Sequence, residues 1–201
     1  MTTTATSSLR LRLTLTSLLA LLGCLAAAAC TQSEWREMEI SEGGFSVLMR
    51  GDPHYLRQDL ETPAGKMAAH LYSSDRPESY FAVGYSDYPL ALIVGAQPDQ
   101  LFNSVRDTWV RRIKGRLVAS DNTIKLAGKY PGMEFSAEGS DPKGDTFVQS
   151  RLFLVDQRLY QLVAMGRKGE VPQGTVNRFL NSFRLVPVSE TGTIKIEPAA
   201  K

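Results

Sequence analysis

The stretch RLFLVDQRLYQLV, residues 151–163, contains two apolar runs separated by the polar residues 156–158. Short runs of strand-forming residues with a polar turn between them are typical of a β-hairpin. Extending each run to the neighbouring turn residues predicts strands over residues 146–155 and 159–165. This hairpin is the clearest in the chain, and it indicates an antiparallel sheet.

The chain on both sides of this hairpin shows an apolar period of mostly two residues, interrupted by turn residues. The turn-forming stretch Thr62–Gly65 separates two such runs, which predicts a second hairpin. Proline and glycine end several of the other runs. We therefore predict further strands over residues 35–40, 45–49, 55–61, 66–72, 80–85, 118–126 and 133–137.

Two segments have apolar residues at helical spacing instead. Residues 98–115 begin with Pro98 and end at Gly115 after several basic residues, which favour the two ends of a helix. In residues 172–183 the apolar side chains follow the spacing i, i+3, i+4, i+7. Strands combined with two amphipathic helices predict the α+β class, with each helix packed on a sheet.

Five stretches between Gly44 and Leu185 consist mainly of turn and core residues: GFSVLMRGDP, YFAVGYSDYP, YPGMEF, RLFLVDQRLYQLV and FLNSFRL. Together they resemble the PsbP/DcrB-like family, which includes bacterial envelope lipoproteins and a lumenal photosystem protein. The resemblance implies a central antiparallel sheet with helices packed on its faces, an α/β/α sandwich. It implies no specific activity, because members of the family use this fold to dock to different protein complexes.

The first thirty residues have the pattern of a bacterial export signal. Arg10 and Arg12 precede an apolar run over residues 13–29, and the chain becomes polar directly after Cys30. The run is short for a membrane-spanning helix, which needs about 20 apolar residues. A cysteine after small residues at the end of such a signal resembles a lipobox, in which the cysteine receives a lipid. We therefore expect a lipid anchor that holds the protein at a membrane.

Two cysteines compete for this lipid. Leu21–Cys24 has the usual leucine-rich form, whereas Cys30 stands at the boundary between apolar and polar residues. Cleavage before Cys24 would leave an apolar stub on the mature chain, so we favour Cys30 and keep Cys24 as the alternative. An ordinary secretory signal cut near Ala29 and an uncleaved anchor are two further interpretations.

These boundaries divide the chain into a lipoprotein signal peptide over residues 1–29, a single PsbP/DcrB-like domain over residues 30–187 and a loose C-terminal tail over residues 188–201. The 172 residues from Cys30 onward suffice for one well-packed domain. The expected location is the periplasmic face of the bacterial cell envelope. Thr31 differs from the aspartate that resembles an inner-membrane retention signal, so the outer membrane is favoured.

The composition of the exported part excludes some function classes. From Cys30 onward, 21 basic residues balance 21 acidic ones, because Arg10 and Arg12 lie in the signal. A formal net charge of zero does not suggest nucleic-acid binding. Cys30 is the one cysteine in this part of the sequence, so the domain must be stabilised by packing and not by internal disulfides.

Candidate catalytic and metal-binding residues are few. His54 and His70 are the two histidines, and neither lies in a nucleophile motif, so we expect no enzymatic activity. If the hairpin around Thr62–Gly65 forms, the histidines could approach each other, with Asp52 or Asp59 adding an oxygen ligand. Zinc sites usually need three or four ligands, so we expect neither a metal site nor a cofactor.

A partner surface is expected near the tyrosines that follow residue 80, because tyrosine is favoured at protein interfaces. We nominate Tyr85, Tyr88 and Leu90. The apolar stretch over residues 87–94 is either an exposed patch or a buried crossover, of which burial is favoured. We thus expect a non-enzymatic lipoprotein that docks to an envelope protein complex. The alternative is a periplasmic protein that binds a small ligand or a cation in a cleft between sheet and helix.

Overall fold

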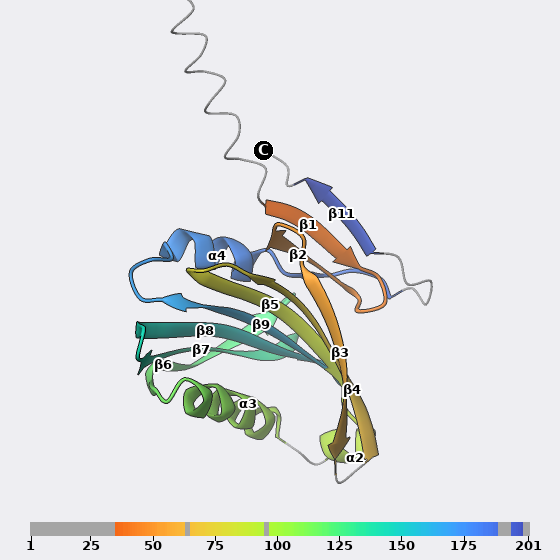
Figure 1. Cartoon of the computed structure of the whole chain (residues 1–201). Coiled ribbons are helices and arrows are strands. Elements are labelled where there is room, and N and C mark those ends of the chain that lie inside the picture. The colour runs from red at the N-terminus through yellow and green to blue at the C-terminus, as the bar shows by residue number, and fades with distance from the viewer. Residues whose placement is uncertain (1–34, 63–64, 95–96, 189–193, 199–201) are drawn as a thin grey trace, which may run out of the picture. The chain divides into compact units, whose positions relative to one another are not determined.

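The computed structural model describes residues 35–62, 65–94, 97–188 and 194–198. Its larger sheet consists of seven strands: β3 (His54–Thr62), β4 (Gly65–Asp75), β5 (Ser79–Asp87), β6 (Arg116–Leu126), β7 (Tyr130–Asp141), β8 (Gly144–Val155) and β9 (Arg158–Arg167). Their order is β3-β4-β5-β9-β8-β7-β6, and every neighbouring pair is antiparallel (Figure 1). The hairpin predicted from residues 151–163 therefore lies near the middle of this sheet.

The smaller sheet consists of four strands: β1 (Trp35–Ile40), β2 (Phe45–Arg50), β10 (Arg184–Leu185) and β11 (Ile194–Pro198). Their order is β10-β2-β1-β11. Along β2, the side chains of Phe45, Val47 and Met49 are buried. The Phe45 ring makes edge contacts with Tyr72 and Tyr85 of the larger sheet, so β2 packs on one face of that sheet.

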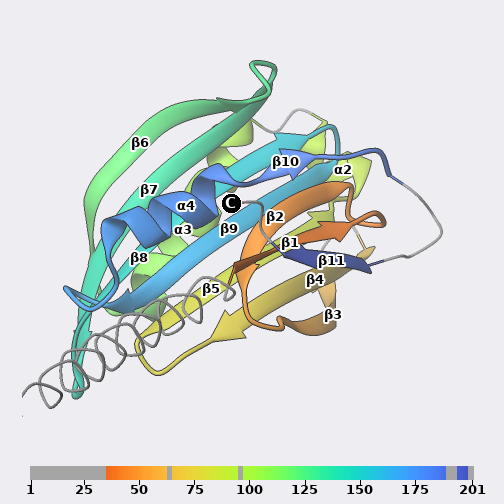
Figure 2. The ribbon, with the colours of Figure 1, turned by 90° about the horizontal axis from the view of Figure 1, so that it is seen from above.

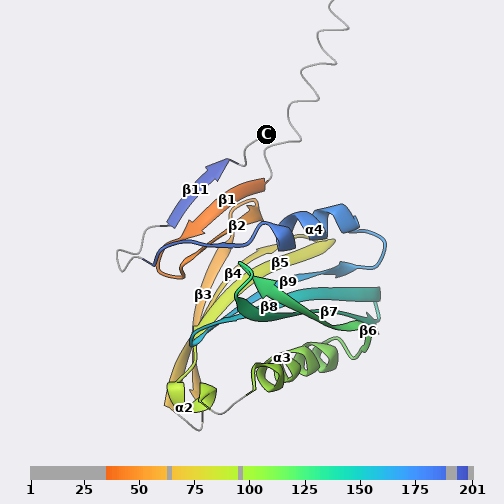
Figure 3. The ribbon, with the colours of Figure 1, turned by 180° about the vertical axis from the view of Figure 1, so that it is seen from behind.

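Three helices accompany the sheets in the described residues: α2 (Leu90–Ile93), α3 (Pro98–Arg112) and α4 (Gln173–Asn181). α3 packs on β7 and β8, whereas α4 contacts β8, β9 and β2. Figures 1 and 3 show α3 on one face of the larger sheet, and α4 on the other face together with the smaller sheet.

The predicted fold class, an α+β sandwich with helices packed on the faces of one central sheet, is wrong. The described residues form eleven strands in two antiparallel sheets, and α2 has only four residues. Much of one face of the larger sheet is covered by strands of the smaller sheet and not by a helix. An apolar residue at every second position predicts a strand but does not indicate which sheet the strand joins. The sequence therefore does not distinguish β1 and β2 from strands of the larger sheet.

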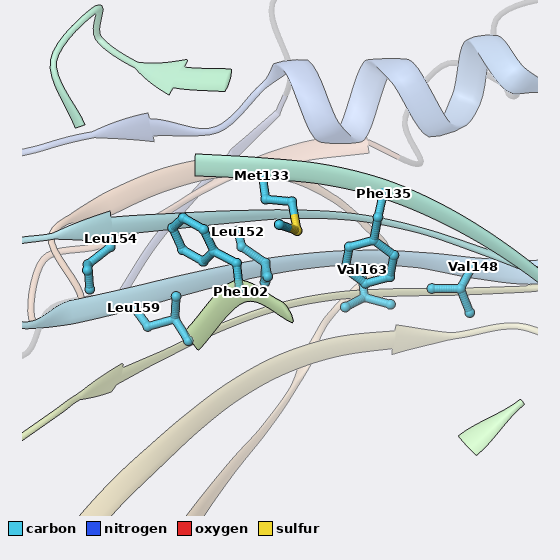
Figure 4. Close-up of a cluster of buried hydrophobic side chains, with 8 residues drawn as sticks. All are labelled: Phe102, Met133, Phe135, Val148, Leu152, Leu154, Leu159 and Val163. Atoms are coloured by element: carbon cyan, nitrogen blue, oxygen red, sulfur yellow. The ribbon is translucent and has the colours of Figure 1, made fainter. Parts of the chain in front are cut away.

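The core between α3 and the larger sheet is a cluster of buried apolar side chains (Figure 4). Burial of such side chains contributes about 1.5–3 kcal/mol each, which is the main term that holds α3 in place. The cluster comprises Phe102 of α3 and Met133, Phe135, Val148, Leu152, Leu154, Leu159 and Val163 of the sheet.

The individual elements predicted from the sequence are confirmed within a few residues, including both helices. The expected loose tail over residues 188–201 differs from the structure, because residues 194–198 form β11, paired with β1 (Figure 2). Ile194 and Ile196 of β11 stay about half exposed, so little apolar burial marks this strand in the sequence. The expected signal peptide over residues 1–29 lies outside the described residues and stays a prediction.

Candidate functional site

The two histidines proposed as weak metal ligands do not face each other. In the β3–β4 hairpin, His70 lies opposite Arg57, whereas His54 lies opposite Ser73. Successive side chains of a strand point to opposite faces of the sheet, so His54 and Arg57 lie on different faces. His70 shares a face with Arg57, its cross-strand partner. The two histidines therefore lie on opposite faces of the sheet. Among the described residues, no group of three His, Cys, Asp or Glu side chains is arranged to hold a metal ion. Cys24 and Cys30 lie outside those residues.

His70 instead belongs to a row of stacked side chains that crosses four strands, β3, β4, β5 and β9. Its Nδ1 and the Tyr55 hydroxyl form a 2.9 Å hydrogen bond, and its ring stacks on Tyr85 with 4.4 Å between centroids. The Arg158 guanidinium lies 4.7 Å from the centroid of Tyr85. We call Tyr55, His70, Tyr85 and Arg158 the aromatic row. Tyr85 and Arg158 are held together by a cation–π interaction, which fixes the cation over the ring.

Arg158 also connects the two sheets. Its Nε and Nη2 donate hydrogen bonds to the two carboxylate oxygens of Asp87, each at 2.6 Å. Its Nη1 donates to the backbone carbonyls of Glu42 and Gly43, each at 3.0 Å, in the turn between β1 and β2. The Tyr160 hydroxyl donates to the Gly43 carbonyl at 2.7 Å. The two hydrogen bonds from Arg158 to Asp87 suit the planar guanidinium, whose N–H donors match the two oxygens of a carboxylate.

The surroundings of the aromatic row keep Tyr85 neutral and Arg158 charged. Burial raises the pKa of Tyr85, and it raises the pKa of the neighbouring Tyr72 to about 12. The hydrogen bonds to Asp87 raise the pKa of Arg158. Burial lowers the pKa of His70, and the cation of Arg57 acts in the same direction. The row therefore presents a fixed cation and aromatic rings, an arrangement suited to packing and recognition.

The predicted partner residues separate into buried and exposed ones. Tyr85 is only 3% exposed and packs inside the aromatic row, so it does not contribute to an outer surface. Leu90, at the start of α2, is 57% exposed, and Val94 directly after the helix is 69% exposed. The interpretation of residues 87–94 as a buried crossover therefore describes only part of the stretch, since Tyr88 and Ile93 are partly buried against the core. Leu90, Ala91 and Val94 are exposed and form an apolar patch.

This patch adjoins two hollows that share Tyr88. One of about 250 Å³ lies between α2 and α3, lined by Leu92, Ile93, Leu101 and Leu154 among others. The other, of about 260 Å³, lies under β3 and β4, where the lining includes Leu56, Leu60, Met67, Leu71 and Val105. Among the residues that the structure describes, no Lys, Arg, Asp or Glu side chain lines either hollow. We call the patch and the two hollows together the apolar surface.

A cleft of different character lies farther along the same face. It has a volume of about 460 Å³ and is lined by Tyr80, Trp109, Arg112, Asp75 and Gln161, with apolar residues between them. The Nε2 atom of Gln161 is buried and has no hydrogen-bond partner among the described residues. A neighbouring hollow of about 410 Å³ shares Asp75, Tyr80 and Arg112 with it. We call this the polar cleft.

Sequence reasoning missed the polar cleft, because its residues come from β4, β5, β9 and α3. No local motif joins them. The one available signal is the end of α3, where Arg112 stands three residues after Trp109.

Comparison with known proteins finds no matching family model and no matching curated protein. Among solved structures, the chain is similar to the solution structure of cyanobacterial PsbP (CyanoP) from Synechocystis sp. PCC 6803. The TM-score is 0.48 at 11% sequence identity, and the match covers 78% of this chain and 95% of that chain. The DcrB-like lipoprotein branch stays a prediction. In the described part of the chain, no helix is both long and apolar enough to cross a membrane.

Proposed function

We propose that this protein is a non-enzymatic lipoprotein of the bacterial envelope, of the DcrB-like branch, that docks to another envelope protein through the apolar surface. The observation that carries the proposal is the exposure of Leu90 and Val94 next to two hollows without charged lining. Contiguous exposed apolar patches on a soluble domain mark sites of interaction. The export signal and lipobox pattern of the sequence support the location.

The chemistry of the apolar surface indicates the kind of partner. Its lining combines leucine, isoleucine and valine with the ring of Tyr88 and the uncharged Gln97 and Gln100. A charged segment would lose its hydration there without gaining an opposite charge, which opposes binding. We therefore infer a partner segment that presents uncharged apolar side chains, with Leu90 as an anchor residue.

Site-specific photo-crosslinking in living cells tests this docking. A photoreactive amino acid at Leu90 should give one discrete adduct with an envelope protein, identified by mass spectrometry. The matched control is the same amino acid at Lys125, an exposed residue of β6. With the purified partner, Leu90→Asp should raise Kd about tenfold or more, because a buried anchor residue typically contributes that much. Lys125→Gln should leave Kd unchanged.

Two results would contradict the docking proposal. One is capture at Leu90 no greater than at Lys125. The other is an adduct whose purified partner binds the Leu90→Asp variant as tightly as the wild type.

A second candidate function, the binding of a small ligand, is favoured by the polar cleft. The unpartnered Nε2 of Gln161 is a hydrogen-bond donor, and the Arg112 side chain supplies a cation close to the Trp109 ring. A small, flat molecule with an acceptor or a negative group would match these features. In the described part of the chain, no group of three His, Cys, Asp or Glu side chains supports the cation-binding form of this alternative.

Native mass spectrometry of protein purified under mild conditions tests the second candidate. A bound small molecule that is retained by the wild type and lost from Gln161→Leu and Trp109→Ala would support it. Retention of the molecule by both variants would exclude the polar cleft as its site.

A further inference from the structure

β3 forms one edge of the larger sheet and is long and regular. All nine of its residues pair with β4 without a register shift, from His54 opposite Ser73 to Thr62 opposite Gly65. Within the described residues, no strand pairs with the other side of β3. Tyr55 and Leu56 on this edge are 49% and 57% exposed. Unpaired backbone groups on such a strand are a template for the addition of another strand.

The other sheet edges are less suited to strand addition. β6 has two register shifts against β7, between Leu117 and Ala119 and between Ala119 and Asn122. Such bulges twist an edge and interrupt its hydrogen-bonding pattern. In the smaller sheet, β10 has two residues, and β11 has five and ends at Pro198. β3 contains neither a bulge nor a proline, and its charged residues are Arg57, Asp59 and Glu61.

The sequence of β3 is complementary to itself when two copies run antiparallel with Gln58 opposite Gln58. In that register Arg57 lies opposite Asp59 of the other copy, twice by symmetry. Leu56 lies opposite Leu60 on the other face, also twice. Opposite charges and apolar pairs directly across two strands stabilise antiparallel pairing. A twofold interface requires this self-complementarity, because the same surface meets itself.

The charges that would pair are available. Arg57 and Asp59 form a 2.9 Å ion pair within β3, but their side chains are 53% and 62% exposed. Exposed ion pairs contribute little to stability, so replacing the internal pair of each copy, two in total, by two pairs across an interface costs little. On the opposite face, Leu56 and Leu60 line the hollow under β3 and β4. Pairing two copies would place the leucines of both next to each other.

We propose that two copies of this chain associate by antiparallel pairing of their β3 strands around a twofold axis at Gln58, which joins their larger sheets. This inference goes beyond the proposed docking function, because it concerns the backbone edge of β3, which shares Leu56 and Leu60 with the apolar surface but not the patch around Leu90.

Disulfide trapping tests the register. Residues directly opposite in an antiparallel pair have Cα atoms about 4.5–5.5 Å apart, which a disulfide can bridge. Gln58→Cys in the full chain should therefore form a disulfide-linked dimer under mild oxidation. The matched control His54→Cys lies on the same strand and face, but its symmetry mate would be eight residues away along the pairing. It should form no more covalent dimer than the wild type. The wild type gives the baseline for any disulfide formed through Cys24 or Cys30.

Charge exchange tests the pairing without new cysteines. Arg57→Asp places two carboxylates opposite each other and should weaken dimerisation about tenfold or more. The double variant Arg57→Asp with Asp59→Arg restores both opposite-charge pairs and should restore the dimer. The measurement is sedimentation equilibrium of the full chain in density-matched detergent, which keeps a lipidated form in solution.

Three outcomes would overturn the proposal. The first is a Gln58→Cys chain that forms no more covalent dimer than His54→Cys. The second is a covalent product of a mass other than twice the chain, since β3 would then bind a different protein. The third is a dimerisation constant that is unaffected by Arg57→Asp, or that the double variant fails to restore.

Discussion

Arg158 is the residue on which the contact between the sheets depends most. Its side chain is 19% exposed and bonds both Asp87 in β5 and the carbonyls of the turn between β1 and β2. Arg158→Met keeps part of the packing on Tyr85 but removes every charged hydrogen bond. We expect it to lower the free energy of unfolding by about 2 kcal/mol, since the half-exposed Asp87 can regain water.

Urea unfolding measures this loss, with Arg57→Met as the control. Arg57 is half exposed and should contribute less than about 0.5 kcal/mol. Equal effects of the two substitutions would contradict the role assigned to Arg158.

His70 gives the stability a dependence on pH. Its pKa in the folded protein is lowered from 6.5, mainly by burial and further by Arg57 and Arg158, while Glu42 and Asp87 oppose the shift. As the pH falls below about 6.5, the unfolded chain therefore binds a proton before the folded chain does. This contribution to stability is present above the unfolded pKa, falls with falling pH and becomes constant below the folded pKa.

Two measurements check this direction. The NMR titration of the His70 ring should have its midpoint below pH 6.5, with His54→Gln used to assign the two histidine signals. In urea unfolding, His70→Gln should lose less stability than the wild type between pH 7 and pH 5. Parallel stability curves for the two proteins would contradict the assignment.

At the scale of elements, α4 depends on its buried stripe. Val176, Phe179 and Leu180 are buried, and the Phe179 ring meets Phe81 of β5 edge on, with 5.3 Å between centroids. Phe179→Ala should lower the free energy of unfolding by about 3–5 kcal/mol, because it removes a large side chain and leaves a cavity. Asn177→Ala, on the exposed side of the same helix, should change it by less than about 0.5 kcal/mol. Thermal or urea unfolding distinguishes the two.

The elements themselves could be predicted because their patterns are local. The period of two marks the hairpin of β8 and β9, and the four-residue recurrence of Leu101, Val105, Trp109 and Ile113 marks α3. The division of the strands into two sheets could not be predicted. It depends on which strands pair with each other, and the local pattern of a strand does not identify its partner. β2 shows the problem, because Phe45 and the adjacent Ser46 are both buried although their side chains lie on opposite faces of the strand.

The candidate site could be predicted only in part for the same reason. The stretch with Tyr85, Tyr88 and Leu90 stood out as rich in aromatic and apolar residues, and Leu90 is indeed exposed. Tyr85 is buried because the alternation of β5 turns its side chain toward Phe45. Whether an apolar side chain faces the core or the solvent depends on which elements pack on each face, which a single sequence does not state.

At the scale of the whole molecule, different faces and edges are suited to different tasks. The apolar surface around Leu90 is suited to docking, the polar cleft around Gln161 to a small ligand, and the β3 edge to a second copy of the chain. These regions share some residues, because Leu56 and Leu60 of β3 and Gln161 of the polar cleft also line the hollow under β3 and β4. Leu90, Trp109 and Arg57 each belong to only one of the three regions, so substitutions at these residues test the proposals separately.

The central claim is that a lipid on Cys30 holds this docking domain at a bacterial membrane. Its most direct test is the intact mass and membrane fractionation of the native protein, compared with Cys30→Ser and Cys24→Ser. We predict a wild-type chain that begins at Cys30, carries lipid mass and sediments with membranes. Cys30→Ser should lose the lipid and the membrane association, whereas Cys24→Ser should keep both. An unmodified, soluble wild-type chain that begins near Thr31 would contradict the account.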